Sequence, residues 1–218
     1  MIPKAVIFDM DGLMFDTERL GLDAWQYIGA QMNINIAEDL VLRLIGLNWE
    51  SAKKLLSHEF HEIDFSQAHT LFSEYLHDSI ESRGLPIKTG LFELLSFLDE
   101  LKIKKAVATS SLYEEAMFYM KKAGIENRFD TIVTGDMVTF GKPNPDIFLH
   151  AAKLLSVPPE DCIVLEDSIN GIKAASAANM LPIMIPDLIL PNEEIESLLH
   201  AKLDSLSDVI PLIKDCII

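Results

Sequence analysis

The chain has 218 residues, of which 49% are hydrophobic and 24% are charged. This composition is typical of a globular protein, and the length suffices for one α/β core and a small second domain. The formal net charge of −16, with no basic run to offset it, argues against nucleic acid and anionic membranes as partners. The sequence contains no run of 18 apolar residues, so we expect no transmembrane helix. The apolar run at the start of the sequence is too short for a secretory signal.

The two cysteines, Cys162 and Cys216, form no CxxC motif, which argues against zinc and redox sites. Cys162 stands in an apolar run and is expected to be buried. A reducing, cytoplasmic environment is therefore the expected location.

Five short apolar runs predict a parallel β-sheet. The first, residues 4–8, is rich in β-branched side chains and stops at Asp9, as is typical of a strand buried on both faces. The others span residues 105–108, 131–133, 163–165 and 181–185, although Pro182 weakens the start of the last. Helical patterns lie between the runs, at residues 91–101, 113–123, 145–155 and 170–178. Strands that alternate with helices predict an α/β fold with a doubly wound, Rossmann-like parallel sheet. The sequence after residue 187 gives no clear assignment.

Residues 17–84 interrupt this alternation. They contain no clear strand, and apolar residues such as Leu22 and Trp25 recur at helical spacing. We expect four helices here, with a return to the core where glycine and proline interrupt regular structure. The predicted organisation is a core of residues 1–16 and 85–218 with a small helical domain inserted between them.

Four polar clusters follow the predicted strands, at the edge where a parallel sheet binds ligands. The first is Asp9-Met10-Asp11-Gly12. Its two carboxylates lie close enough to repel, so a bound cation or a shared proton is expected. A solvated turn is the alternative, because Asp and Gly favour turns.

The second and third clusters carry groups that can hold a phosphate. Thr109-Ser110-Ser111 offers hydroxyls and turn amides, although these residues could simply cap the next helix. In Gly141-Lys142-Pro143-Asn144-Pro145, two prolines stiffen the loop that presents Lys142. A solvated surface lysine is the alternative there.

The fourth cluster is Glu166-Asp167-Ser168. Two acids directly after an apolar strand suit Mg²⁺, which prefers hard oxygen ligands. The alternative is that Asp167 or Ser168 caps the following helix.

In this order, the four clusters resemble the motifs of the haloacid-dehalogenase-like hydrolases. The matching segments are FDMDGLMFDTE at residues 8–18, VATSS at 107–111, GKPNPDIF at 141–148 and VLEDSING at 164–171. The resemblance spans nearly the whole chain, and the inserted helices match the position of the family's cap domain. The subgroup is the one that includes β-phosphoglucomutase and many sugar-phosphate phosphatases.

The resemblance implies a Mg²⁺-dependent phosphatase acting on a phosphate monoester. Asp9 would be the nucleophile that forms an aspartyl-phosphate, and Asp11 would act first as general acid and then as general base. Thr109 and Lys142 would complete the catalytic set. Thr109, Ser110 and Lys142 would hold the phosphoryl group.

The resemblance also implies a metal site. Mg²⁺ would lie between the carboxylate of Asp9, the main-chain carbonyl of Asp11 and Asp167, with Glu166 close by or bound through water. The four acids carry −4 if all are ionised, and Mg²⁺ with Lys142 returns +3. A proton on Asp11 would remove the excess charge, so we expect its pKa to be raised in the substrate complex.

The nearest alternative is a phosphomutase of the β-phosphoglucomutase type. Such relatives carry a cap histidine that gates transfer and a cap arginine that grips the second phosphate, whereas Gly21 and Trp49 fall at those positions here. Both departures favour a phosphatase, although Lys53 and Lys54 lie one helical turn past Trp49 and could face inward. A dehalogenase is disfavoured because halide needs no proton from Asp11.

The expected partner is a small phosphorylated metabolite. Hexose, pentose and polyol phosphates and pseudouridine 5′-phosphate all fit the motifs, and the sequence does not choose among them. A monomer is expected, with no nucleic acid or membrane as partner.

Overall fold

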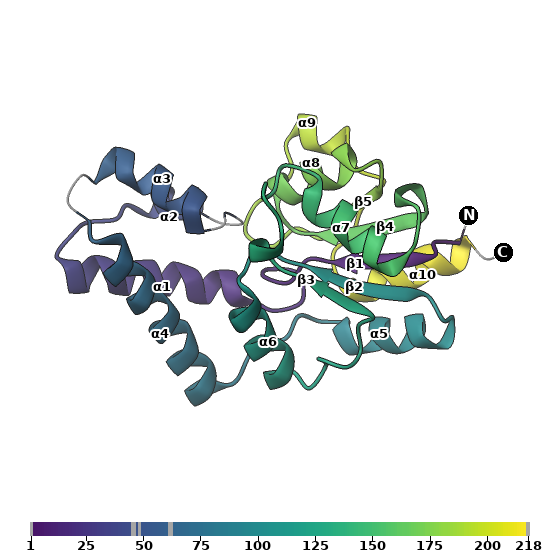
Figure 1. The fold of residues 1–218 in the computed structure, drawn as a ribbon, viewed down its shortest axis with the longest axis horizontal. Helices are drawn as coiled ribbons and strands as arrows, with labels where there is room; N and C mark the ends of the chain where they lie inside the picture. The colour runs from purple at the N-terminus through teal and green to yellow at the C-terminus, as the bar shows by residue number, and fades with distance from the viewer. Residues whose placement is uncertain (1, 45–46, 48, 61–62, 217–218) are drawn as a thin grey trace.

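The computed structural model describes residues 2–44, 47, 49–60 and 63–216, and it confirms the predicted α/β fold (Figure 1). The core is a parallel sheet in the order β3-β2-β1-β4-β5-β6. Its strands are β1 (Ala5–Phe8), β2 (Lys104–Ala108), β3 (Thr131–Val133), β4 (Cys162–Glu166), β5 (Leu181–Met184) and β6 (Ala201–Lys202). The first five match the predicted runs to within one residue at each end. The sixth lies in the C-terminal part that gave no assignment.

Helices cover both faces of the sheet (Figure 1). They are α5 (Leu91–Glu100), α6 (Tyr113–Lys122), α7 (Asp146–Leu155), α8 (Ile169–Ala177), α9 (Glu193–Glu196) and α10 (Val209–Asp215). Successive residues of a strand point to opposite faces. Accordingly, Ala5 and Ile7 of β1 pack with α7 and α8, whereas Val6 and Phe8 pack with α5, α6 and α10. Cys162 is fully buried in β4, as predicted.

Four further helices lie beside this core (Figure 1). They are α1 (Thr17–Met32), α2 (Glu38–Leu42), α3 (Trp49–Glu59) and α4 (Phe65–Arg83). They enclose their own apolar cluster, which contains Trp25, Ile28 and Leu56 and is separate from the clusters on the two faces of the sheet. The four predicted helices are thus present. Across the described ranges, no helix is long and apolar enough to cross a membrane.

Backbone hydrogen bonds tie the outgoing connection of these helices to the returning one. The amide of Asp16 donates to the carbonyl of Pro86 over 2.9 Å, and the amide of Lys88 donates to the carbonyl of Met14 over 3.0 Å. The segment that leads from the core to α1 and the segment that leads from α4 back to the core therefore run side by side as a hydrogen-bonded pair.

Asp187, in the loop after β5, fastens this pair of segments to the core. Its Oδ1 accepts hydrogen bonds from Arg19 of α1 over 2.6 Å and from Lys88 over 2.8 Å. The side chain of Asp187 is only 3% exposed, whereas that of Arg19 is 50% exposed. A buried carboxylate needs such partners, because an uncompensated buried charge is costly. Asp187 thus links both connections to the sheet.

Replacement of Asp187 by alanine should lower the free energy of unfolding by about 1–3 kcal/mol, because it leaves Lys88 and Arg19 without their shared carboxylate. The loss is smaller than for a fully buried pair, since Arg19 remains half in water. Urea unfolding at constant pH measures it. The matched control is Asp78→Ala, whose side chain is 86% exposed and which should change stability by less than about 0.5 kcal/mol. Equal effects of the two variants would contradict the role given to Asp187.

Candidate active site

The register of the sheet brings three sequence motifs to one edge. β1 pairs with β2 and β4 so that Asp9, Thr109 and Glu166 leave the sheet within one residue of each other. The ends of parallel strands at a point where the strand order reverses are the usual place for a ligand in such folds. The predicted meeting of the motifs is therefore found.

Lys142 lies between these strand ends, in the loop that precedes α7. Its ammonium group donates to Asp9 Oδ1 over 2.5 Å, to Glu166 Oε1 over 2.7 Å and to the carbonyl of Ala108 over 3.1 Å. Its side chain is 2% exposed, and the ring of Phe148 lies 5.0 Å from the ammonium nitrogen. The alternative of a solvated surface lysine is therefore wrong.

Two glycines make room for the acids of the fourth motif. A Cβ on Gly171 would lie 1.7 Å from Glu166 Oε1, and a Cβ on Gly12 would lie 2.2 Å from Asp167 Oδ2. Gly12 also has a φ of +79°, which favours glycine. The amide of Ser168 donates to Glu166 Oε2 over 2.7 Å. Both oxygens of Glu166 are therefore engaged, one by Lys142 and one by this amide.

Three buried carboxylates are grouped closely enough to hold one cation. Asp9, Glu166 and Asp167 each offer an oxygen, and these oxygens lie within 4.8 Å of one another. The group contains neither sulfur nor imidazole, so it suits a hard divalent ion such as Mg²⁺. Of the four predicted metal residues, Asp11 does not place its carboxylate in this group. Its main-chain carbonyl was the predicted ligand, and that role stays a prediction.

The pKa values in this group reflect burial without enough positive charge. The pKa of Asp9 is raised to about 8, chiefly by burial and in part by repulsion from Glu166, while the charge of Lys142 opposes the shift. Burial, followed by repulsion from Glu166, holds the pKa of Asp167 well above its usual range. Burial opposes the charge of Lys142, yet the carboxylates of Asp9 and Glu166 raise its pKa. The cluster therefore requires protons or a further cation.

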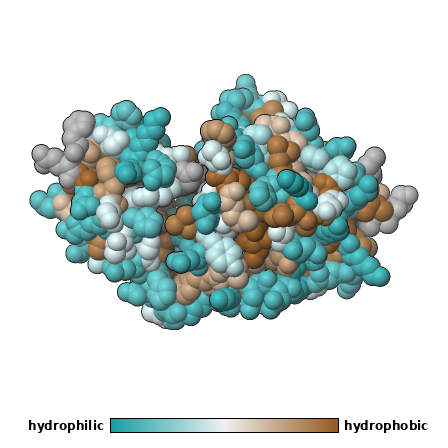
Figure 2. Space-filling model, in the orientation of Figure 1, coloured by the Kyte–Doolittle hydropathy of each residue, from teal (hydrophilic) through white to brown (hydrophobic). Residues whose placement is uncertain are grey.

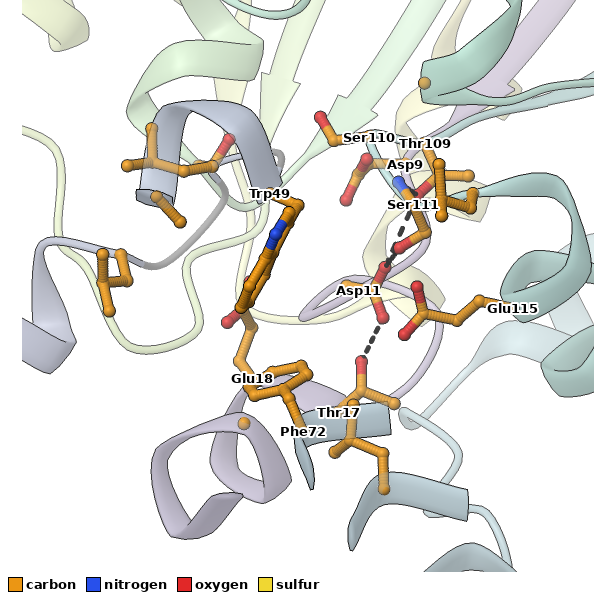
Figure 3. A pocket seen from close by; sticks show the side chains of 18 of the residues that line it. Asp9, Asp11, Thr17, Glu18, Trp49, Phe72, Thr109, Ser110, Ser111 and Glu115 are labelled. Atoms are coloured by element: carbon orange, nitrogen blue, oxygen red, sulfur yellow. Dashed lines mark hydrogen bonds between the residues drawn. The ribbon is translucent and has the colours of Figure 1, made fainter. Parts of the chain in front are cut away.

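The carboxylate of Asp11 belongs to a separate hydrogen-bonded group. Thr17 donates to Oδ1 over 2.5 Å, and Ser111 donates to Oδ2 over 2.8 Å; Thr109 lies 3.4 Å from the same oxygen (Figure 3). Burial raises the pKa of Asp11, although the hydrogen bonds from Thr17 and Ser111 oppose the shift. Asp11 is thus held in place by hydroxyl groups, while burial shifts its equilibrium towards the protonated form.

The structure rules out the helix-capping alternative for the second motif and bears it out for Ser168 of the fourth motif. α6 begins after Leu112 without any side-chain cap, so Thr109, Ser110 and Ser111 do not serve as its N-cap. Ser168 does cap α8, because its hydroxyl accepts a hydrogen bond from the amide of Gly171 over 3.0 Å.

A cavity of about 430 Å³ lies between the edge of the sheet and helices α1, α3 and α4. The surface is hollowed between these two parts of the molecule (Figure 2). Eight described residues that line the cavity are acidic: Asp9, Asp11, Glu18, Glu50, Glu115, Asp136, Glu166 and Asp167. Among the same described lining residues, Lys142 is the one lysine or arginine. The cavity is therefore strongly negative away from Lys142.

Aromatic side chains form the wall of the cavity opposite the carboxylates (Figure 3). The ring of Trp49 stacks on that of Trp25, with centroids 5.7 Å apart and planes 2° apart, and it meets the edge of His69 at 4.6 Å. Lys53 and Lys54 are exposed and do not line the cavity. The inward-facing orientation considered for these two lysines is thus not found.

Several lining residues were not predicted from the sequence to belong to the site. Glu115, His69 and Phe72 all reach the cavity. Glu115 carried a detectable signal, since it stands in the first turn of the helix after the second motif. His69 and Phe72 lie on α4, far from any motif, and only the packing of α4 against α1 brings them to the site.

Comparison with known proteins agrees with the geometry. The sequence model of the haloacid dehalogenase-like hydrolases matches residues 6–185. A phosphorylated carbohydrates phosphatase of Thermotoga maritima is 33% identical over 81% of this chain and 82% of its own. A beta-phosphoglucomutase of Bacillus subtilis is 34% identical over 83% of this chain and 82% of its own.

Among solved structures, CbbY from Rhodobacter sphaeroides in complex with phosphate superposes with a TM-score of 0.82 at 28% identity, covering 96% of both chains. The family model, the sequence relatives and the similar solved structure all agree with the grouping of the four motifs at the edge of the sheet. The chain therefore belongs to the haloacid dehalogenase-like hydrolase family.

Proposed function

We propose that the protein is a Mg²⁺-dependent phosphatase that hydrolyses a small phosphate monoester through an aspartyl-phosphate at Asp9. One arrangement carries the proposal. Lys142 is buried between Asp9 and Glu166 at the floor of a cavity, so a fixed positive charge lies beside a carboxylate that faces the ligand space. Such a site suits phosphoryl transfer, where catalysis is mainly positioning and charge stabilisation.

In the first step, an oxygen of Asp9 attacks phosphorus, and the bond from phosphorus to the ester oxygen breaks. Asp11 gives its proton to the departing oxygen. Water then attacks the phosphorus of the aspartyl-phosphate, Asp11 takes the proton from that water, and Asp9 is released with inorganic phosphate. Splitting the reaction in this way replaces one difficult step by two easier ones.

The surroundings of Asp11 support its role as acid. Burial raises its pKa, which favours the protonated form that a general acid needs. Thr17 and Ser111 hold the two carboxylate oxygens in place. A positioned general acid contributes roughly 10²–10⁴-fold to the rate.

The phosphoryl group would be held by Thr109, Ser110 and Lys142. All three line the cavity beside Asp9. Lys142 needs no movement to reach this position, because its ammonium group is already fixed by Asp9 and Glu166. Preorganised donors of this kind stabilise the transition state without reorganisation.

The metal would be held by Asp9, Asp167 and the carbonyl of Asp11, with Glu166 acting through water because its oxygens already accept other hydrogen bonds. When bound, Mg²⁺ would offset the repulsion among these acids and polarise the oxygens of the phosphoryl group.

A phosphomutase is the second candidate, and the 34% identity to a beta-phosphoglucomutase favours it. A mutase must bind a bisphosphate in both orientations, which requires a second anion site on the cap side. Among the described lining residues, Lys142 is the one permanent cation, and Trp49 forms an apolar wall at the position where the mutase-type relatives carry their arginine. These features favour the phosphatase.

The remaining expectations belong to the same proposal. Residues 17–84 would act as a cap domain that closes over the site and excludes water, with residues 1–16 and 85–218 as the catalytic core. A monomer in the cytoplasm, acting on a phosphorylated carbohydrate or a similar metabolite, stays a prediction.

³¹P NMR with β-glucose 1-phosphate and a trace of glucose 1,6-bisphosphate separates the two candidates. We expect steady growth of the inorganic phosphate signal at a rate that does not depend on the bisphosphate. Asp9→Asn, the matched control, should lose at least about 10³-fold in rate. Rapid conversion to glucose 6-phosphate with little free phosphate would show a mutase instead.

The buried acids predict a stability that depends on pH in the metal-free protein and depends on it less with Mg²⁺ bound. The pKa of Asp9 is about 8 in the folded metal-free protein and about 3.9 in an unfolded chain. Between these values the folded state binds the extra proton, so its stability falls as the pH rises from about 4 to about 8. With saturating Mg²⁺, Asp9 should stay ionised and the decline should be smaller.

Urea unfolding at several pH values, in EDTA and in Mg²⁺, measures this difference. EDTA should also abolish turnover, and added Mg²⁺ should restore it. Asp167→Asn is the control: it removes one repelling charge, so the metal-free variant should be at least as stable as the wild type and gain little from Mg²⁺. Identical pH profiles with and without Mg²⁺ in the wild-type protein would argue against the site.

A further inference from the structure

We propose that Glu115 is a specificity-determining residue, whose carboxylate accepts a hydrogen bond from a hydroxyl group on a neutral, polyhydroxylated leaving group. This inference rests on the proposed phosphatase function and names its substrate class. The reaction described above uses Asp9, Asp11 and Lys142 and gives Glu115 no part.

Glu115 is held in a fixed position at the cavity. It stands in the first turn of α6 and lines the cavity beside Asp11 (Figure 3). Tyr119, one helical turn later, donates its hydroxyl to Glu115 Oε1 over 3.0 Å. Tyr119 is itself fully buried and packs edge-on against Phe15 at 6.2 Å. The carboxylate is therefore oriented from behind by a rigid side chain.

The carboxylate lacks a cationic partner. In the ranges that the structure describes, no lysine, arginine or histidine forms an ion pair with Glu115. Glu115 is half-buried, and besides the hydroxyl of Tyr119 the side chain of Ser111 also lies within hydrogen-bonding reach of its carboxylate. A carboxylate has about four lone-pair sites, so it has capacity for further hydrogen bonds. Donors on a bound ligand would satisfy that capacity, and a carboxylate acceptor gives stronger hydrogen bonds than a neutral one.

The opposite wall shows what kind of ligand fits. Trp49 and Phe72 face Asp11 and Glu115 across the cavity (Figure 3). Trp25 stacks behind Trp49 and fixes its plane. A sugar ring or a polyol chain presents C–H bonds on one side and hydroxyl groups at its edge. Its C–H side would cover the aromatic wall, since burying apolar surface is favourable, while its hydroxyls would reach Glu115.

The charge of the cavity excludes a second anionic group. Lys142 is the single lysine or arginine among its described lining residues, and it is already shared by Asp9 and Glu166. A distal phosphate or carboxylate would meet the acid of Glu115 with no cation to offset it. The leaving group should thus carry hydroxyls and no charge.

Steady-state kinetics on two classes of ester test this assignment. Ribose 5-phosphate and glucose 6-phosphate carry hydroxyls on the leaving group, whereas phenyl phosphate carries none. Burial raises the pKa of Glu115 to about 7, so the assays are run at about pH 8.5, where it is ionised. For Glu115→Gln, the ratio of kcat/KM for the better sugar ester to that for phenyl phosphate should fall about tenfold or more, mainly through KM, because a hydrogen bond to a charged acceptor is lost. Tyr119→Phe should shift the ratio in the same direction by a smaller factor.

Glu114→Gln is the matched control, since Glu114 precedes Glu115 on α6 and is exposed. Its ratio should equal that of the wild-type protein. An equal loss on both classes of ester by Glu115→Gln would overturn the proposal, because Glu115 would then act through Asp11 or the fold. A ratio unchanged by Glu115→Gln, or a wild type that prefers phenyl phosphate, would also overturn it while leaving the phosphatase function intact. A wild type inactive on all three esters would remove the proposed function and this inference with it.

Discussion

The buried ion pairs of Lys142 are the interaction on which the rest of the site depends. Its ammonium group bonds to Asp9 and Glu166, and all three side chains are almost fully enclosed. Burial of charges carries a large desolvation cost, which close and well-directed hydrogen bonds offset only in part. These ion pairs are therefore expected to add little to the free energy of folding. They hold the ammonium group of Lys142 in a fixed position at the cavity, where it presents a positive charge to a ligand.

The rest of the fold supplies what this group needs. The parallel register brings the ends of β1, β2 and β4 level, and the chain after β3 returns Lys142 to the same edge. Gly12 and Gly171 lack the Cβ atoms that would collide with Asp167 and Glu166. Because these acids are buried with Lys142 as their one cationic neighbour among the described residues, their negative charge is not fully compensated, and the pKa of Asp9 is raised. A divalent cation held by Asp9, Glu166 and Asp167 would supply part of the missing positive charge.

Much of this could be predicted from the sequence because the core strands are short, apolar and directly followed by polar motifs. β6 could not, since Ala201–Lys202 is too short to show a period. Pro182 is accommodated inside β5, where its carbonyl accepts a hydrogen bond from the amide of His200. The cavity wall formed by α1, α3 and α4 could not be predicted in the same way, because the positions of Trp49 and His69 depend on how these helices pack beside the core. Local sequence does not encode those distances.

The central claim is that the phosphoryl group passes through Asp9 on its way to water, and the stereochemistry at phosphorus tests it most directly. An aryl phosphorothioate made chiral with ¹⁸O is hydrolysed in water enriched in ¹⁷O, and the configuration of the released thiophosphate is determined. Two successive in-line displacements, first by Asp9 and then by water, predict overall retention of configuration. Inversion would mean that water attacks the ester directly, and it would contradict the account.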